Sequence, residues 1–446
     1  MNRHSSPDRE ALIQALTVSA TNNPSKPALA EWAELAVDID NFRTRPSWHR
    51  APPGLRFLAV DTASACNLTC PRMCYYHPTA TVQRPRAEIE RFTLAVVQAA
   101  TDLGLGTLAF AGKEPLVDTP RLAALAEAAN AIPNRTFSIG LVTNGTLVER
   151  NWDTLDRLVR DGVIDFIDVS IDSPHAAQHD EIRGLAGAHA AAHKALARML
   201  AEWPELRIGT TSVLRNDNVG AIADLVELAD PRLRHFFVFP FQPPIFEESD
   251  PPPDWTTINE CMDAVEAVLA GARRGDGIDV SVSLLGLHVA DAVASGKISL
   301  DALEEDENGQ IYFRRAVGGN TLTIFLQVLP ETGRHGLRIL SDGTVLPGTH
   351  YLQAPRPERF AVGNIIGESI LDIHQRAGAA DSAIDRLWAT RPDHACRDRP
   401  CWPVCFGGIA VSDNNILTGK PLVLPPELCI SSGAESANAT LGRPTR

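Results

Sequence analysis

The sequence lacks three features that would each assign it to a broad class. It has no uninterrupted apolar run of about 18 residues, the minimum that suggests a membrane-spanning helix. The first residues, MNRHSSPDREALIQAL, contain no apolar core of signal-peptide length. Basic residues are not in excess either, since 41 Lys and Arg stand against 55 Asp and Glu and give a net charge of -14. We therefore expect a cytoplasmic location, no membrane partner and no nucleic-acid partner.

The chain has only eight cysteines, and in a reducing compartment these are expected to be ligands or core residues rather than disulfides. Cys66, Cys70 and Cys74 lie four residues apart in CNLTCPRMCYYHP, directly after the apolar run Leu55–Val60. Pro71 argues against a helix here, because proline lacks an N–H and clashes with the preceding turn. The pattern predicts a loop that brings three thiols together, which is typical of a metal or cluster site.

Two occupants are compatible with this loop. Zinc would need a fourth ligand, and His77 could supply it to complete a Cys3His site. A four-iron cluster held by only three thiolates would instead leave one iron open for a further ligand. The spacing alone does not decide between the two.

The central part of the chain alternates between apolar runs and helical patterns. The runs that predict buried parallel strands are Leu55–Val60, Thr107–Ala111, Phe137–Val142, Phe166–Ile171, Leu206–Val213 and Phe236–Phe241. The helical patterns between them include Ile89–Ala100, Leu122–Ala131, Leu155–Val159, Ala190–Leu200 and Ile222–Ala229. This alternation predicts an α/β fold, a partial (β/α)6 TIM-like barrel with a C-terminal cysteine-rich extension. Its chemistry would lie at the carboxyl ends of the strands.

We expect four parts: an N-terminal extension (1–50), the barrel (51–245), a connecting segment (246–320) and a C-terminal domain (321–446). The boundary after the barrel is predicted by the proline-rich segment Pro243–Trp255. A helix at about Ile258–Ala272 and a strand at Asp279–Leu284 follow, and LRILSDGTVLP (337–347) predicts a hairpin around Asp342-Gly343.

A second group of cysteines lies near the C-terminal end of the sequence. It consists of Cys396, Cys401, Cys405 and Cys429, with prolines and glycines between them. No helix or strand would use such a pattern for packing, so we predict a second metal or cluster site; the alternative is an irregular, thiol-containing tail. The remaining cysteine, Cys261, lies within a predicted helix and is expected to be a small buried core residue.

Four short motifs follow successive predicted strands: AGKEP (111–115), TNGT (143–146), VSIDS (169–173) and, a little later, HDEIRG (179–184). Each alone is typical of turn chemistry. Together, facing one mouth of a barrel and following the cysteine loop, they resemble the motifs of radical S-adenosylmethionine (AdoMet) enzymes. The C-terminal cysteines resemble the SPASM/twitch branch of that superfamily, whose extension carries auxiliary clusters.

The resemblance implies a [4Fe–4S] cluster on Cys66, Cys70 and Cys74, with the open iron chelated by the methionine moiety of AdoMet. Gly112 and Glu114, in the position of the family's GGEP motif, would hold the ammonium group of the cofactor. The remaining implied contacts are Arg183 with the carboxylate, Ser170 and Asp172 near the ribose and carboxylate, and Thr143, Asn144 and Gly145 at the pocket floor.

The sequence departs from the family pattern at three places. Three residues separate each pair of cysteines, where the family commonly has three and then two. Lys113 replaces the second glycine of GGEP, and its charge is expected near the site. Gly348 stands where the family's extension usually has a cysteine after the hairpin. We therefore expect one auxiliary cluster, on the four C-terminal cysteines, rather than two.

The resemblance implies reductive cleavage of AdoMet to a 5′-deoxyadenosyl radical, with an external electron donor such as flavodoxin or ferredoxin. Relatives with such extensions commonly modify peptides, so a ribosomally made peptide that is crosslinked or oxidised is the first expectation. The alternatives are a small-molecule substrate, such as a sugar or an amino acid, and a non-catalytic protein with structural zinc sites. No spacing of acidic residues singles out a catalytic general base.

Overall fold

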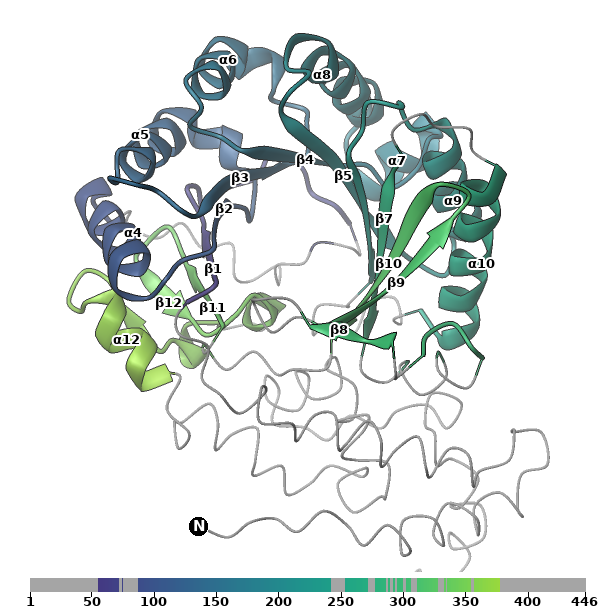
Figure 1. Cartoon of the computed structure of the whole chain (residues 1–446). Helices are drawn as coiled ribbons and strands as arrows, with labels where there is room; N and C mark the ends of the chain where they lie inside the picture. Colours follow the sequence, from purple (N-terminus) through teal and green to yellow (C-terminus); the bar gives the residue numbers. More distant parts are fainter. Residues whose placement is uncertain are drawn as a thin grey trace, which may run out of the picture.

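The fold is built on one strongly curved sheet with helices along its outer side (Figure 1). The computed structural model describes residues 55–71, 74, 87–241, 253–271, 277–285, 288, 292, 295–299, 302–305, 311–327, 333, 335–353 and 357–377. In this part of the chain the strand order is β13-β12-β11-β1-β2-β3-β4-β5-β6-β7-β10-β9-β8.

Six consecutive parallel strands form the centre of the sheet. They are β1 (Phe57–Val60), β2 (Thr107–Phe110), β3 (Ser138–Thr143), β4 (Phe166–Ser170), β5 (Arg207–Leu214) and β6 (His235–Pro240). The helices between them are α4 (Ile89–Asp102), α5 (Thr119–Asn130), α6 (Trp152–Arg160), α7 (Ala176–Arg183), α8 (Ala188–Glu202) and α9 (Val219–Leu228), with short 3₁₀ turns η2 (Pro115–Asp118) and η3 (Glu149–Asn151). The predicted partial (β/α)6 barrel is confirmed.

The sheet continues beyond β6. Helix α10 (Trp255–Gly271) leads to β7 (Asp279–Leu285), which pairs parallel with β6. Strand β10 (Asn320–Gln327) pairs parallel with β7, and two antiparallel strands, β9 (Ile311–Val317) and β8 (Glu304–Glu305), complete this side.

The other side of the sheet is closed by a segment from much later in the chain. Strand β11 (Gly336–Ile339) pairs parallel with β1, and β12 (Thr344–Leu346) returns antiparallel to β11, which confirms the predicted hairpin. The last elements that the structure describes are η5 (His350–Gln353), η6 (Pro357–Phe360), β13 (Gly363–Asn364) and α12 (Ile370–Ala377).

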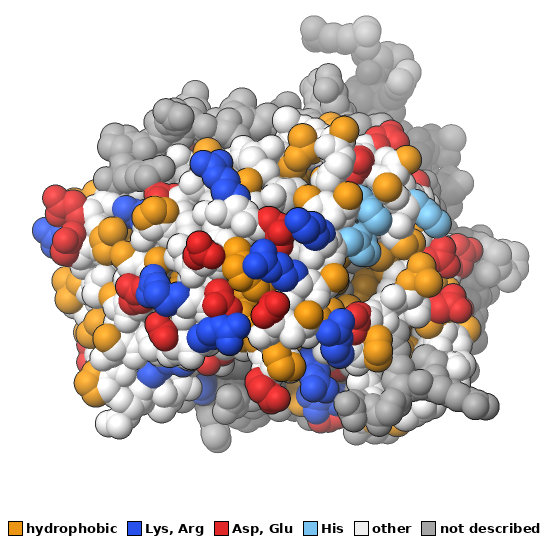
Figure 2. Space-filling model, turned by 90° about the horizontal axis from the view of Figure 1, so that it is seen from above, with side chains coloured by type: hydrophobic (Ala, Val, Ile, Leu, Met, Phe, Trp, Pro, Cys, Tyr) orange, Lys and Arg blue, Asp and Glu red, His pale blue; other side chains and the backbone are white. Residues whose placement is uncertain are grey.

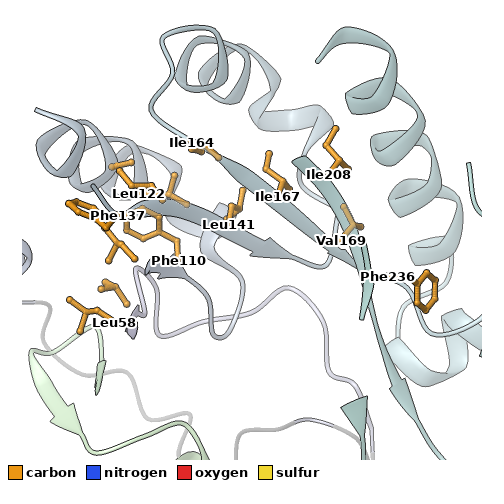
Figure 3. Close-up of a cluster of buried hydrophobic side chains, with 14 of the residues drawn as sticks. Leu58, Phe110, Leu122, Phe137, Leu141, Ile164, Ile167, Val169, Ile208 and Phe236 are labelled. Atoms are coloured by element: carbon orange, nitrogen blue, oxygen red, sulfur yellow. The ribbon is translucent and has the colours of Figure 1, made fainter. Parts of the chain in front are cut away.

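The main core lies between the sheet and the surrounding helices. Side chains alternate along a strand, so Ile167, Val169, Ile208 and Phe236 face the helices and are almost fully buried (Figure 3). Burying each such side chain stabilises the fold by about 1.5–3 kcal/mol. The intervening residues face the concave side of the sheet, and the carboxyl ends of the parallel strands meet along one edge, where the cysteine loop begins.

The outer face over α6 and α8 carries acidic and basic side chains side by side (Figure 2). Glu149, for example, pairs with both Lys194 (2.8 Å) and Arg198 (3.2 Å). Among the residues that the model describes, no helix combines the length and the apolar character needed to cross a bilayer.

Candidate functional site

The three cysteines of the first motif lie in an irregular loop after β1. Residues 61–71 contain neither helix nor strand, as Pro71 predicts. Cys70 has a left-handed φ of 38°, a conformation that non-glycine residues seldom adopt. The thiols of Cys66, Cys70 and Cys74 are free and partly buried. The loop is held by hydrogen bonds from the Leu68 N–H to Cys66 Sγ (3.4 Å) and from the Cys74 N–H to the Cys70 carbonyl (3.0 Å).

Burial and two neighbouring cations act in opposite directions on the pKa of the thiols in this loop. Burial raises the pKa of the Cys66 thiol and raises that of Cys70 to about 11, because a thiolate loses hydration there. The two neighbouring cations, Lys113 beside Cys66 and Arg183 beside Cys70, oppose this rise. Thiolates are soft ligands for iron–sulfur clusters and zinc, so the donor set fits such a group.

The described residues contain no set of three His, Cys, Asp or Glu side chains arranged to share one metal ion. A four-iron cluster does not require this arrangement, since each thiolate binds a different iron. His77, which could complete a zinc site, lies outside the described residues.

The loops after β2 and β3 are joined by one buried carboxylate. Glu114, 1% exposed, accepts hydrogen bonds from the Leu116 N–H (3.1 Å), the Thr143 hydroxyl (2.8 Å) and the Asn144 N–H (2.8 Å). Burial raises the pKa of Glu114, and these three donors oppose the rise by stabilising the ionised form. A carboxylate accepts about four hydrogen bonds, so Glu114 retains capacity for one more donor. Gly112, two residues earlier, has a φ of 130° that favours glycine.

The loop after β3 also contacts the cysteine loop. The Asn144 side-chain amide donates to Asn67 Oδ1 (3.0 Å) and lies 4.0 Å from Cys66 Sγ, while the Asn67 amide donates to the Thr146 hydroxyl (2.7 Å). The AGKEP and TNGT motifs are therefore brought together with the cysteine loop, as their positions after successive strands predict.

A second buried pair lies on the other side of the cysteine loop. Arg183 Nη2 is 2.7 Å from Asp172 Oδ2, and the two side chains are 11% and 0% exposed. The Arg183 guanidinium also lies near the Cys70 thiol, and its charge opposes the rise in the pKa of that thiol. Ser170, the last residue of β4, is partly buried two residues before Asp172. The VSIDS and HDEIRG motifs thus meet at the cysteine loop through this ion pair.

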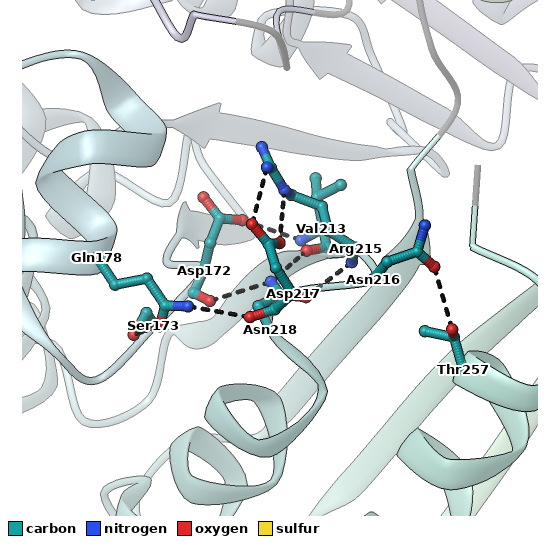
Figure 4. Close-up of polar contacts among 9 residues, drawn as sticks. All are labelled: Asp172, Ser173, Gln178, Val213, Arg215, Asn216, Asp217, Asn218 and Thr257. Carbon is teal, nitrogen blue, oxygen red and sulfur yellow. Dashed lines mark hydrogen bonds and ion pairs between the residues drawn. The ribbon is translucent and has the colours of Figure 1, made fainter. Parts of the chain in front are cut away.

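Asp172 is fixed by the end of β5 and the loop that follows it (Figure 4), and by α7. Its Oδ1 accepts from the Val213 N–H (2.9 Å), its carbonyl accepts from the Asn218 side chain (3.4 Å), and its own N–H donates to His179 Nδ1 (3.2 Å). Burial lowers the pKa of His179 to about 4, so the imidazole stays neutral and can accept this hydrogen bond.

The structure adds one site contact that sequence reasoning missed. Arg338 of β11, 3% exposed, places Nη2 2.5 Å from Asp61 Oδ1 and 3.1 Å from the Ala111 carbonyl. It therefore joins the residue after β1 to the residue before Gly112. The only signal in the sequence is an arginine in the apolar stretch LRIL of the hairpin.

The third cysteine also contacts the later hairpin. Cys74 packs against a small cluster formed by Leu340, Leu346, Tyr351 and Leu352. The second cysteine group, Cys396, Cys401, Cys405 and Cys429, lies outside the described residues, so the predicted auxiliary site stays a prediction.

Comparison with known proteins agrees with this geometry. Residues 60–229 match the model of the Radical SAM superfamily, so the chain contains a domain of that superfamily. No curated protein matches the sequence.

The fold is similar to solved structures of native anSMEcpe with bound AdoMet. With the Kp18Cys peptide the TM-score is 0.55 at 18% identity, and with the Cp18Cys peptide it is 0.54 at 16%; both cover 86% of this chain and 97% of that one. The structure with AdoMet alone gives 0.53 at 17% identity and covers 85% and 96%. At such identities the likeness concerns the fold.

Proposed function

We propose that this protein is a radical AdoMet enzyme whose first cluster is held by Cys66, Cys70 and Cys74. The observation that carries the proposal is the meeting of three free thiols with the Glu114 and Asp172–Arg183 sites at one edge of a parallel sheet. Cys66, Cys70 and Cys74 would hold a [4Fe–4S] cluster, which would supply the electron for reductive cleavage of AdoMet and so the radical chemistry on the substrate. The protein binds, orients and excludes water.

The residues around the loop would bind AdoMet by complementary charge. Glu114 and the backbone at Gly112 would take the ammonium group, because a buried carboxylate with remaining acceptor capacity favours a cationic donor. Arg183 would take the carboxylate while its pairing with Asp172 keeps the guanidinium in place. Ser170 and Asp172 would lie near the ribose, and Thr143 and Asn144 would shape the pocket floor.

For the substrate, we favour a ribosomally made peptide that is crosslinked or oxidised. The anSMEcpe structures of similar fold hold the Cp18Cys and Kp18Cys peptides. A band of aromatic rings on the concave face supports a substrate with apolar side chains. The ring of Phe237 stacks on that of Phe239, with 4.0 Å between the ring centroids, and on that of Phe325, with 5.5 Å between the centroids. Ser281 and Ser283 of β7 lie between these strands and are small enough for the rings to meet.

The extension after the barrel would be of the SPASM/twitch type, with one auxiliary cluster on Cys396, Cys401, Cys405 and Cys429. Such a cluster would accept the electron left on an oxidised substrate or bind the substrate directly. A flavodoxin or ferredoxin of the cytoplasm would reduce the first cluster. A sugar or amino acid is the alternative substrate.

The test is anaerobic reconstitution of the full chain with iron and sulfide, followed by dithionite and AdoMet. We expect release of 5′-deoxyadenosine, with about eight irons per chain for two four-iron clusters or about four for the first loop alone. Cys70→Ala should abolish release, whereas Cys261→Ala, in the buried face of α10, should retain it. Bound zinc without iron, or full release by Cys70→Ala, would contradict the proposal.

A further inference from the structure

The C-terminal end of α7 touches the cysteine loop directly. The Cys70 N–H donates to the Arg183 carbonyl (3.1 Å), and the Thr69 hydroxyl donates to the Gly184 carbonyl (3.4 Å). Two successive carbonyls of the helix end therefore bind two successive residues of the loop. This contact joins segments 115 residues apart in the sequence.

Gly184 ends α7 in the left-handed conformation, with a φ of 67°. A Cβ added there would lie 2.2 Å from Thr69 Oγ1, 2.7 Å from Pro71 Cδ and 3.3 Å from the Cys70 nitrogen. The first two distances are far below van der Waals contact, and the proline ring cannot rotate away. The loop approaches the helix this closely only because residue 184 has no side chain.

The same helix end reaches the Cys70 thiol through the Arg183 guanidinium, which also pairs with Asp172. The hydrogen bond from the Cys70 N–H to the Arg183 carbonyl holds the backbone of Cys70 in its unusual φ of 38°. Gly184 determines whether those contacts can form, since it sets the distance between the helix end and the loop.

We propose that Gly184 is a positioning residue for the first cluster site: by lacking a side chain, it lets the end of α7 fix the backbone of Cys70. It acts through Cys70 and Arg183 and touches no reacting group. The role in cluster binding rests on the proposed function, whereas the effect on the geometry of Cys70 does not.

The chain provides a matched control at Gly187. This residue lies three positions later, also before α8, and has a similar φ of 84°. A Cβ at Gly187 would meet nothing within 4 Å. Gly184→Ala and Gly187→Ala therefore share the conformational cost of a left-handed alanine, and only the first displaces the cysteine loop.

The first measurement is the rate at which iodoacetamide alkylates Cys70 in the metal-free full chain, read by peptide mass spectrometry. Partly buried thiols react slowly, so displacement of the loop should raise the rate. We expect at least about a fivefold increase in Gly184→Ala, the factor that the loss of one hydrogen bond produces, and no change in Gly187→Ala. Equal rates in the two variants would overturn the proposal.

Cys261 reports on folding in the same experiment, because it is fully buried in α10. It should stay unreactive in both variants. If Gly184→Ala exposes Cys261, the triple variant Thr69→Ala/Pro71→Ala/Gly184→Ala decides, since it removes both atoms that lie within 3.0 Å of the new Cβ. If Cys261 is again protected from alkylation, the close contact between residue 184 and the cysteine loop is supported. If Cys261 stays exposed, that contact is refuted as the cause.

A second measurement addresses the cluster. After reconstitution with iron and sulfide, Cys70 should be protected from alkylation in wild type and Gly187→Ala, and substantially less in Gly184→Ala. If Cys70 is unprotected in all three reconstituted chains but the rate difference in metal-free protein remains, the cluster is refuted and the positioning of Cys70 is not. If Cys70 is fully protected in all three chains, including Gly184→Ala, the positioning role for the cluster site is overturned.

Discussion

Removal of the Arg338 side chain should destabilise the fold by much more than removal of a surface arginine. Arg338 and Asp61 are paired with side-chain exposures of only 4% and 5%. Arg338→Met keeps much of the apolar stem but deprives the buried Asp61 carboxylate of this cation. Loss of one partner of a buried ion pair costs about 3–5 kcal/mol, so we expect the free energy of unfolding to fall by about 3 kcal/mol.

The measurement is urea denaturation of the full chain, with Arg157→Met as the control. Arg157 pairs with Glu127 at the surface, with exposures of 50% and 43%, and such pairs contribute about 0–1 kcal/mol. In Arg338→Met, a further Asp61→Asn change should recover part of the loss, because it removes the buried charge. The reasoning is refuted if Arg338→Met costs no more than Arg157→Met.

Three further predictions concern other parts of the molecule. Burial lowers the pKa of His179 to about 4, so between pH 6.5 and 4 the unfolded chain binds a proton that the folded chain does not. As the pH falls through this range, the free energy of unfolding should therefore decrease by about 1.4 kcal/mol per pH unit. His179→Gln should remove this pH dependence. The prediction is contradicted if wild type and His179→Gln lose the same free energy of unfolding between pH 7 and pH 5 in urea titrations. Gly140→Ala would place a Cβ within 1.9 Å of the Phe166 ring and should cost about 1–3 kcal/mol, whereas Gly220→Ala, with nothing within 4 Å, should be neutral or stabilising in the same assay. Cys401→Ala should retain 5′-deoxyadenosine release in the absence of substrate but stop product formation; a normal rate of product would limit the second cysteine group to a structural role.

The central barrel could be predicted because its strands are short apolar runs separated by helical patterns. The run Phe166–Ile171, for instance, became β4 at Phe166–Ser170. Helix α7 was missed, since its eight residues are mostly polar and its buried side is narrow. The hairpin of β9 and β10 was missed as well, although the Gly318-Gly319 turn between two strand-like runs is a hairpin signal.

The grouping of the site motifs followed from strand order, because carboxyl ends of neighbouring parallel strands meet at one edge. That rule predicted the proximity of Glu114 to Thr143 and Asn144. It could not predict the pairing of Arg338 with Asp61, since no local pattern specifies which sheet edge a later hairpin joins. The closeness of Gly184 to Thr69 depends on backbone distances that sequence periodicity does not encode.

The parallel pairing of β11 with β1 has a consequence for how the protein is made. Asp61 and Arg338 are separated by 277 residues, and the ribosome adds about 5–20 residues per second. The strand that pairs with one edge of β1 is therefore synthesised roughly 14–55 seconds after Asp61. The small cluster against which Cys74 packs belongs to the same later segment, so the surroundings of Cys74 are complete only after the hairpin has been synthesised.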